Sequence, residues 1–174
     1  MRTFIKCAIA IACFAVQAAS HAENNLQLSG TIIAATCNVN SDSQNLTVDI
    51  GTFTPSQFGA VGSVSQARQF SISLNDCPEI ISGTKVYFSG TPDVNNTDLL
   101  SLSDTGGGGM ASGVGVEILD SNQLIIPINN TDSQVYPLSA GNNTLGFSLR
   151  YKATNIPVTA GNATAVMYFD LTYQ

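Results

Sequence analysis

Positively charged residues are scarce in this chain of 174 residues, which has six Lys and Arg against twelve Asp and Glu. Only four of the cations, Arg68, Lys85, Arg150 and Lys152, lie beyond residue 22. With so few cations there is no electrostatic basis for binding phosphate backbones or anionic lipid surfaces. The composition therefore excludes a nucleic-acid-binding protein.

Histidine is equally scarce: the single residue, His21, lies near the N-terminus, and tryptophan is absent. Without a histidine in the main part of the chain, Ser-His-Asp and Cys-His arrangements cannot form, nor can most zinc sites. Carboxylates such as Asp49 and Glu117 could act as a pair, but nothing in the sequence brings any two of them together. We therefore expect no enzyme, no catalytic residues, no metal and no cofactor.

Long hydrophobic runs are also missing. The longest, at residues 7–16, follows a basic start and precedes Ser20-His21-Ala22, which is the order of features in a secretory signal peptide. Ten residues give about 15 Å of helix, half of the hydrocarbon core of a bilayer. We expect residues 1–22 to be removed and the exported remainder, with a net charge of −8 from four basic and twelve acidic residues, not to insert into a membrane.

Two of the four cysteines fall within residues 1–22, which leaves Cys37 and Cys77. In an exported chain an oxidising compartment favours their pairing, and the alternative is two buried thiols. On the chain-entropy model, closing a loop of roughly 40 residues contributes about 4 kcal/mol.

The apolar pattern beyond residue 22 has period two, and no stretch keeps a helical stripe for three turns. The candidate strands are 26–34, 46–50, 69–74, 85–88, 114–119, 124–128, 145–152 and 163–173. Clusters of Asn, Asp, Gly and Pro separate them. This pattern predicts an all-β, immunoglobulin-like sandwich of antiparallel strands.

The last candidate strand has two distinct faces. One face carries Ala163, Ala165, Met167, Phe169, Leu171 and Tyr173, and the other carries Thr164, Val166, Tyr168, Asp170 and Thr172. If no later strand covers it, main-chain edge and an apolar groove stay open.

The segment 23–29 offers only Leu26 and Leu28 as apolar anchors, and Gly30 interrupts the alternation before Ile32. It is either an ordinary first strand or a donor strand that fills the open groove of a neighbour.

The sequence resembles the chaperone-usher pilins, specifically type 1 fimbrial subunits, along its length beyond residue 22. The resemblance is carried by Gly30 seven residues before Cys37, by Leu74-Asn75-Asp76-Cys77, and by residues 86–90 followed by Asp98-Leu99-Leu100. The tail is the most specific part. Gly161, fourteen residues from the end, and the penultimate Tyr173 occupy the places that mark the chaperone-binding strand in that family.

The resemblance implies an incomplete immunoglobulin-like fold that lacks its last strand, with 23–29 as an N-terminal extension and 30–174 as the pilin domain. It implies that a periplasmic chaperone first lends a strand beside residues 163–173. At an outer-membrane usher the extension of the next subunit would replace that strand, in donor-strand exchange. It further implies that Leu26, Leu28, Gly30 and Ile32 complete a neighbouring subunit, and that the chain ends up in a fimbria on the bacterial surface, in support of cell adhesion.

Within that family we expect a minor, adaptor-like subunit, because residues 155–161 are similar to the tip adaptors. A major shaft subunit is the alternative. A self-contained secreted lectin-like module, with Asp93, Asn95 and Asp104 as ligand contacts, is an alternative of another class, although the same residue types are typical of β-turns.

Overall fold

The computed structural model describes residues 28–31 and 35–174. Residues 28–31 belong to an N-terminal unit separate from the unit that begins at Ala34, and they form neither helix nor strand. The expected donor residues Leu26 and Ile32 lie outside the described residues. Leu28 and Gly30 are described, and no strand includes them.

The larger unit is built almost entirely of strands, with two single-turn helices between β1 and β2. In chain order the elements are β1 (Asn38–Val39), α1 (Ser41–Gln44), η1 (Pro55–Gln57), β2 (Arg68–Cys77), β3 (Gly83–Gly90), β4 (Val114–Asp120), β5 (Ile125–Ile126), β6 (Val135–Pro137), β7 (Gly141–Ala153) and β8 (Met167–Tyr173). The expected all-β class is confirmed.

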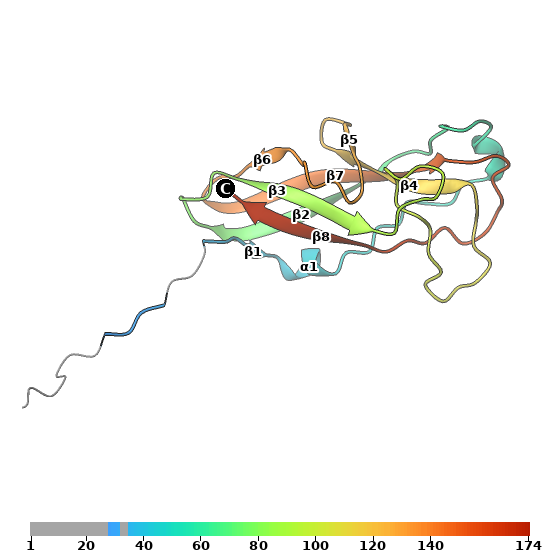
Figure 1. The fold of residues 1–174 in the computed structure, drawn as a ribbon. Helices are drawn as coiled ribbons and strands as arrows, with labels where there is room; N and C mark the ends of the chain where they lie inside the picture. Colours follow the sequence, from blue (N-terminus) through green and yellow to red (C-terminus); the bar gives the residue numbers. More distant parts are fainter. Residues whose placement is uncertain (1–27, 32–34) are drawn as a thin grey trace, which may run out of the picture. The chain divides into compact units, whose positions relative to one another are not determined.

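The strands form two antiparallel sheets, one with the order β1-β2-β7-β4-β5 and one with the order β6-β3-β8. Figure 1 shows β3 and β8 as neighbouring arrows in front of β2 and β7. In the register of the smaller sheet, Phe88 of β3 lies opposite Phe169 of β8. The period-two pattern follows from this arrangement, since alternate side chains face the other sheet.

Aromatic side chains fill the centre of the space between the sheets. The ring of Phe147 lies 5.2 Å from Phe88 and 5.5 Å from both Phe70 and Tyr136, measured between centroids. A second aromatic group joins Phe53 to Tyr151 at 6.0 Å, in an edge-to-face arrangement. The core therefore takes side chains from both sheets and from the segment that precedes β2.

Cys37 and Cys77 form a disulfide, as predicted. Both residues are buried, and the bond joins the start of the described domain to the end of β2. Next to it, β1 pairs with β2 through Asn38 and Val39.

Several sequence-based boundaries differ from the structure. The predicted strand 124–128 is reduced to β5, and β1 has no predicted counterpart. Residues 46–50 form no strand, although their alternation buries Ile50 and half-buries Val48. The last strand begins at Met167, so Ala163 and Ala165 precede it. β6 has no counterpart among the predicted strands, because three residues that end in Pro137 carry little periodic signal.

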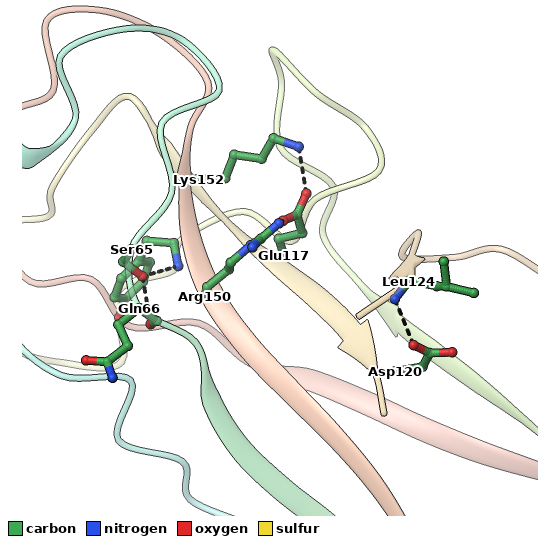
Figure 2. Close-up of polar contacts among 8 residues, drawn as sticks. Ser65, Gln66, Glu117, Asp120, Leu124, Arg150 and Lys152 are labelled. Carbon is green, nitrogen blue, oxygen red and sulfur yellow. Dashed lines mark hydrogen bonds and ion pairs between the residues drawn. The ribbon is translucent and has the colours of Figure 1, made fainter. Parts of the chain in front are cut away.

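The buried carboxylate of Glu117, on β4, lies between two cations of β7. Figure 2 shows Glu117 with Arg150 and Lys152 directed toward it. Arg150 Nε and Lys152 Nζ each donate to a different Glu117 oxygen at 2.6 Å. Glu117 is fully buried, while about a quarter of each cation's side chain is exposed. The burial cost of the carboxylate is thus offset by two charge-assisted bonds.

Asp120 ends β4 and orders the turn that follows, as Figure 2 also shows for its bond with Leu124. Burial raises the pKa of Asp120, but hydrogen bonds from the backbone of Leu124, the amide of Gln134 and the backbone of Asn122 outweigh it. The net pKa lies below its ordinary value, so the carboxylate stays ionised and holds the turn.

We expect Glu117→Ala to destabilise the fold, because it leaves two cations crowded on one sheet face without their carboxylate. Removing one partner of a fully buried ion pair costs about 3–5 kcal/mol, and exposure of the cations reduces this to roughly 1–3 kcal/mol. Urea unfolding followed by circular dichroism measures the change. The control Asp132→Ala removes an exposed carboxylate and should change the free energy of unfolding by less than about 0.5 kcal/mol.

Candidate functional site

The sheet edges in the described domain differ in length and in protection. β1 and β5 have two residues each, β5 is followed by Pro127, and β6 ends at Pro137. Short strands and prolines block further pairing. β8 has seven residues, no proline, and β3 as its only strand partner within 28–31 and 35–174. A long unprotected edge is therefore found at β8.

Main-chain groups alternate in direction along β8. On the far side of β3, the Phe88 carbonyl accepts a hydrogen bond from Asn129 N–H at 2.8 Å, so the Phe88–Phe169 pair is one that is not hydrogen-bonded. The even-numbered residues therefore bond to β3, as Gln174 N–H does to the Gly83 carbonyl at 2.9 Å. The odd-numbered residues of β8 direct their N–H and C=O groups away from β3.

The same odd-numbered residues carry the inward-facing side chains. Met167, Phe169, Leu171 and Tyr173 pack on the core but remain half-buried, whereas Val114, Val116 and Ile118 on β4 are fully buried. Ala165, just before the strand, is also half-buried, and no hydrogen bond to its main chain is formed within the described part of the chain. We call Ala165, Met167, Phe169, Leu171 and Tyr173, together with the main-chain groups that they direct away from β3, the open edge.

The apolar side chains that the core leaves half-buried include a second group, on β1 and on the segment between β1 and β2. Val39, Val48 and Phe53 all pack against the core without being covered by it. In Figure 1 this segment runs below β8. Tyr173 Oη donates to the Cys37 carbonyl at 3.4 Å, which connects the residue just before β1 to the end of β8. Burial raises the pKa of Tyr173, and the hydrogen bond to Cys37 lowers it in part.

At the other end of the open edge, Tyr151 of β7 reaches across the core. Its hydroxyl donates to the Ala163 carbonyl at 2.5 Å. Burial raises the pKa of Tyr151, and the nearby Asp49 carboxylate raises it further. The hydroxyl consequently stays protonated and remains a hydrogen-bond donor.

Gly161 lies where two main-chain segments touch. A Cβ at this position would meet Ala111 N, the Gly109 carbonyl oxygen and Met110 C at 2.4 Å. The neighbouring Asn162 pairs with the same loop: Ala111 N–H donates to its carbonyl at 2.9 Å, and its own N–H donates to the Gly109 carbonyl at 2.8 Å. The glycine is required by this close approach of backbone.

The predicted acceptor residues therefore lie along one line. At its start, Gly161 contacts the loop 109–111 and the Ala163 carbonyl accepts a hydrogen bond from Tyr151. Residues Ala165 to Tyr173 form the open edge. Asp93, Asn95 and Asp104 instead make local turns: Asp93 accepts from Asn95 N–H, and Asp104 accepts from Gly106 and Gly108 N–H. Those backbone bonds lower the pKa of Asp104, which is an ordinary property of turns.

Sequence reasoning missed Tyr151 and Phe53. Tyr151 lies in the predicted strand 145–152, but its contact with Ala163 depends on how the two sheets stack. Phe53 follows Gly51, in a region without period-two alternation, so no pattern marked it as a core residue.

Comparison with known proteins identifies the family. The model of the family described as "Fimbrial protein" matches residues 26–174. The chain is 44% identical to the uncharacterized fimbrial-like protein YcbU of Escherichia coli K12, over 86% of this chain and 84% of that protein. It is 38% identical to the type-1 fimbrial protein A chain of Salmonella typhi, over 86% of this chain and 82% of that protein. The chain belongs to the fimbrial protein family.

Solved structures agree with the fold. The rod subunit PapA of the P pilus superposes with a TM-score of 0.67 at 23% identity, covering 79% of this chain and 99% of PapA. This likeness shows that the all-β sandwich is the immunoglobulin-like fold of pilus subunits.

As a fimbrial subunit the chain is a structural component and not an enzyme, and it is exported to the cell surface in a fimbria. Pilus subunits polymerise with neighbouring subunits. Within 28–31 and 35–174, no helix has the length and apolar character to cross a bilayer.

We expect Phe169→Asp to abolish strand addition at β8, because the charge would lie where an added strand must bury its apolar side chains. Burying an unpaired carboxylate costs several kcal/mol, which weakens binding by about 100-fold or more. Tyr168→Asp is the matched control, since Tyr168 is 68% exposed on the opposite face. Pull-down with the periplasmic chaperone that the resemblance implies measures both variants, and equal recovery would contradict the assignment of the open edge.

Proposed function

We propose that this chain is a link in a fimbria that joins its neighbours by donor-strand exchange. The observation that carries the proposal is the open edge, where unpaired main-chain groups and half-buried apolar side chains occur on the same residues. An added strand would satisfy both at once, main-chain bonds giving affinity and alternate side chains giving register.

The donated strand comes from the N-terminal extension of another subunit, and the extension of this chain, residues 23–29 continuing through Gly30 to Ile32, completes a neighbour in turn. Leu26, Leu28 and Ile32 recur at the even positions that one face of a strand requires. Burying three such side chains contributes roughly 5–9 kcal/mol before association costs are subtracted. The resulting link dissociates slowly, as a fibre requires.

Before incorporation, a periplasmic chaperone covers the same edge, and an outer-membrane usher is where the exchange takes place. Removal of residues 1–22 on export precedes both steps. Support for a chaperone comes from the exposure of the core along the open edge, since a soluble chain with such an edge pairs with other chains unless it is covered.

Hydrogen exchange tests the proposal. The chain is purified with its chaperone. It is then mixed with synthetic peptides, each of which is the N-terminal extension of one subunit encoded beside it, the part that corresponds to residues 23–36 of this chain. Insertion of a peptide should slow exchange at the amides of Met167, Phe169 and Leu171. A chain that is a soluble, monodisperse monomer without chaperone or peptide would overturn the proposal and favour a self-contained binding module.

Gly30→Leu should block donation and spare acceptance. The leucine adds a bulky side chain on the inward face of the donor, and the chaperone contacts the other end of the domain's chain. We expect incorporation into fibres in vitro to fall by at least about tenfold while chaperone recovery is unchanged. The control Ser29→Leu changes the outward face of the same strand. Polymerisation of Gly30→Leu at the normal rate would contradict the assignment of the donor.

For the position in the fibre, we propose the minor, adaptor-like place that residues 155–161 suggest. The shaft is the second candidate, favoured by the name of one relative, the probable major fimbrial subunit LpfA of Escherichia coli O157:H7, which is 34% identical over 98% of this chain and 95% of that protein.

Self-polymerisation separates the two positions. An adaptor should accept a neighbour's donor peptide at least about tenfold faster than its own, because its edge is selected for a different partner. A shaft subunit should accept its own at a comparable or higher rate and form long homopolymers. Electron microscopy of the purified chain after chaperone exchange shows which outcome occurs.

A further inference from the structure

The open edge has a definite end, and Tyr151 forms it. The alternation of β8 continues upstream of the strand: Thr164 is bonded to Ser103, whose N–H donates to the Thr164 carbonyl at 2.8 Å. Ala163, one residue earlier, therefore directs its carbonyl to the same side as the open edge. That carbonyl already accepts a hydrogen bond from the Tyr151 hydroxyl.

We propose that Tyr151 is a specificity-determining residue that fixes how far an added strand extends, so that a donor pairs with residues 165–173 and stops before Ala163. This inference rests on the proposed function. It assigns to one side chain, on the sheet opposite β8, control over the length and register of the partner strand.

The geometry around Tyr151 keeps its hydroxyl in place. The residue is only 8% exposed, its ring packs edge to face on Phe53, and its main-chain N–H is bonded to Ser65 Oγ at 3.0 Å. A side chain fixed by packing and by its own strand has few alternative rotamers, so an arriving strand cannot displace the hydroxyl at little cost.

Upstream of Ala163 the main chain lies outside β8 and contacts the loop 109–111. Asn162 pairs with the loop 109–111 on the side away from the open edge, and no side chain fits at Gly161. An added strand that passed Ala163 would have to share the Ala163 carbonyl with the Tyr151 hydroxyl, which weakens that bond of its ladder. A stop at this point also fixes register, because a one-residue slip would turn the apolar side chains of the donor away from the core.

The test is a series of donor peptides lengthened one residue at a time at the end that lies toward Ala163, added to the complex of the chain with its chaperone. In the native chain, affinity should rise with each residue until the peptide covers Ala165 and then stay constant. In Tyr151→Phe, which keeps the ring against Phe53 and frees the Ala163 carbonyl, the next residue should add about two- to tenfold and its peptide amide should become protected from exchange.

Tyr136→Phe is the control, since it removes a tyrosine hydroxyl from β6, at the opposite edge of the smaller sheet. It should behave as the native chain does. If native affinity continues to rise beyond Ala165, or if Tyr151→Phe shows the native length dependence, the stop is not made by Tyr151. If no peptide inserts into any variant, donor-strand exchange itself fails. If Tyr151→Phe does not fold, a native length series without a stop at Ala165 still overturns the proposal.

Discussion

The unpaired edge of β8 is the constraint around which the rest of the domain is arranged. A strand with one free side leaves its N–H and C=O groups to water, and here the side chains on the same residues, from Met167 to Tyr173, also remain half-buried. Within residues 28–31 and 35–174, both deficits lie on the side of β8 where no strand pairs with it. Because hydrogen bonding and burial are incomplete at the same residues, one added strand would supply both.

A domain with an incomplete core needs stability from elsewhere, and in this chain it comes from the larger sheet. The disulfide fixes Cys37 to the end of β2, Glu117 joins β4 to β7 through two cations, and the Phe147 aromatic group connects both sheets. The smaller sheet has only three strands and contributes the edge. The division lets the acceptor side stay incomplete while the rest of the domain keeps its shape, which pre-organises the edge for binding.

Local periodicity made most of the strands predictable. The predicted strands 69–74, 85–88, 114–119 and 145–152 lie within β2, β3, β4 and β7, because buried strands in a sandwich alternate inward and outward side chains. The same rule was wrong at 46–50, where Leu46, Val48 and Ile50 alternate without pairing to a strand. Alternation reports which side chains face the core, and pairing requires in addition a neighbouring strand that sequence periodicity does not reveal.

The limits of the open edge could not be read from periodicity. The alternation of residues 163–173 is continuous in sequence, yet the strand begins only at Met167. Upstream of it, the Ala163 carbonyl accepts a hydrogen bond from Tyr151, and Gly161 contacts the loop 109–111. Each of these limits is a contact between segments remote in the chain, so it depends on the stacking of the sheets and not on local pattern. Because the binding edge has a fixed length, the acceptor helps to set the register of the donor strand, and the donor sequence does not have to set it alone. In a fibre built from one repeated strand exchange, an acceptor that limits register prevents a slip in one link from turning every apolar side chain of that donor outward.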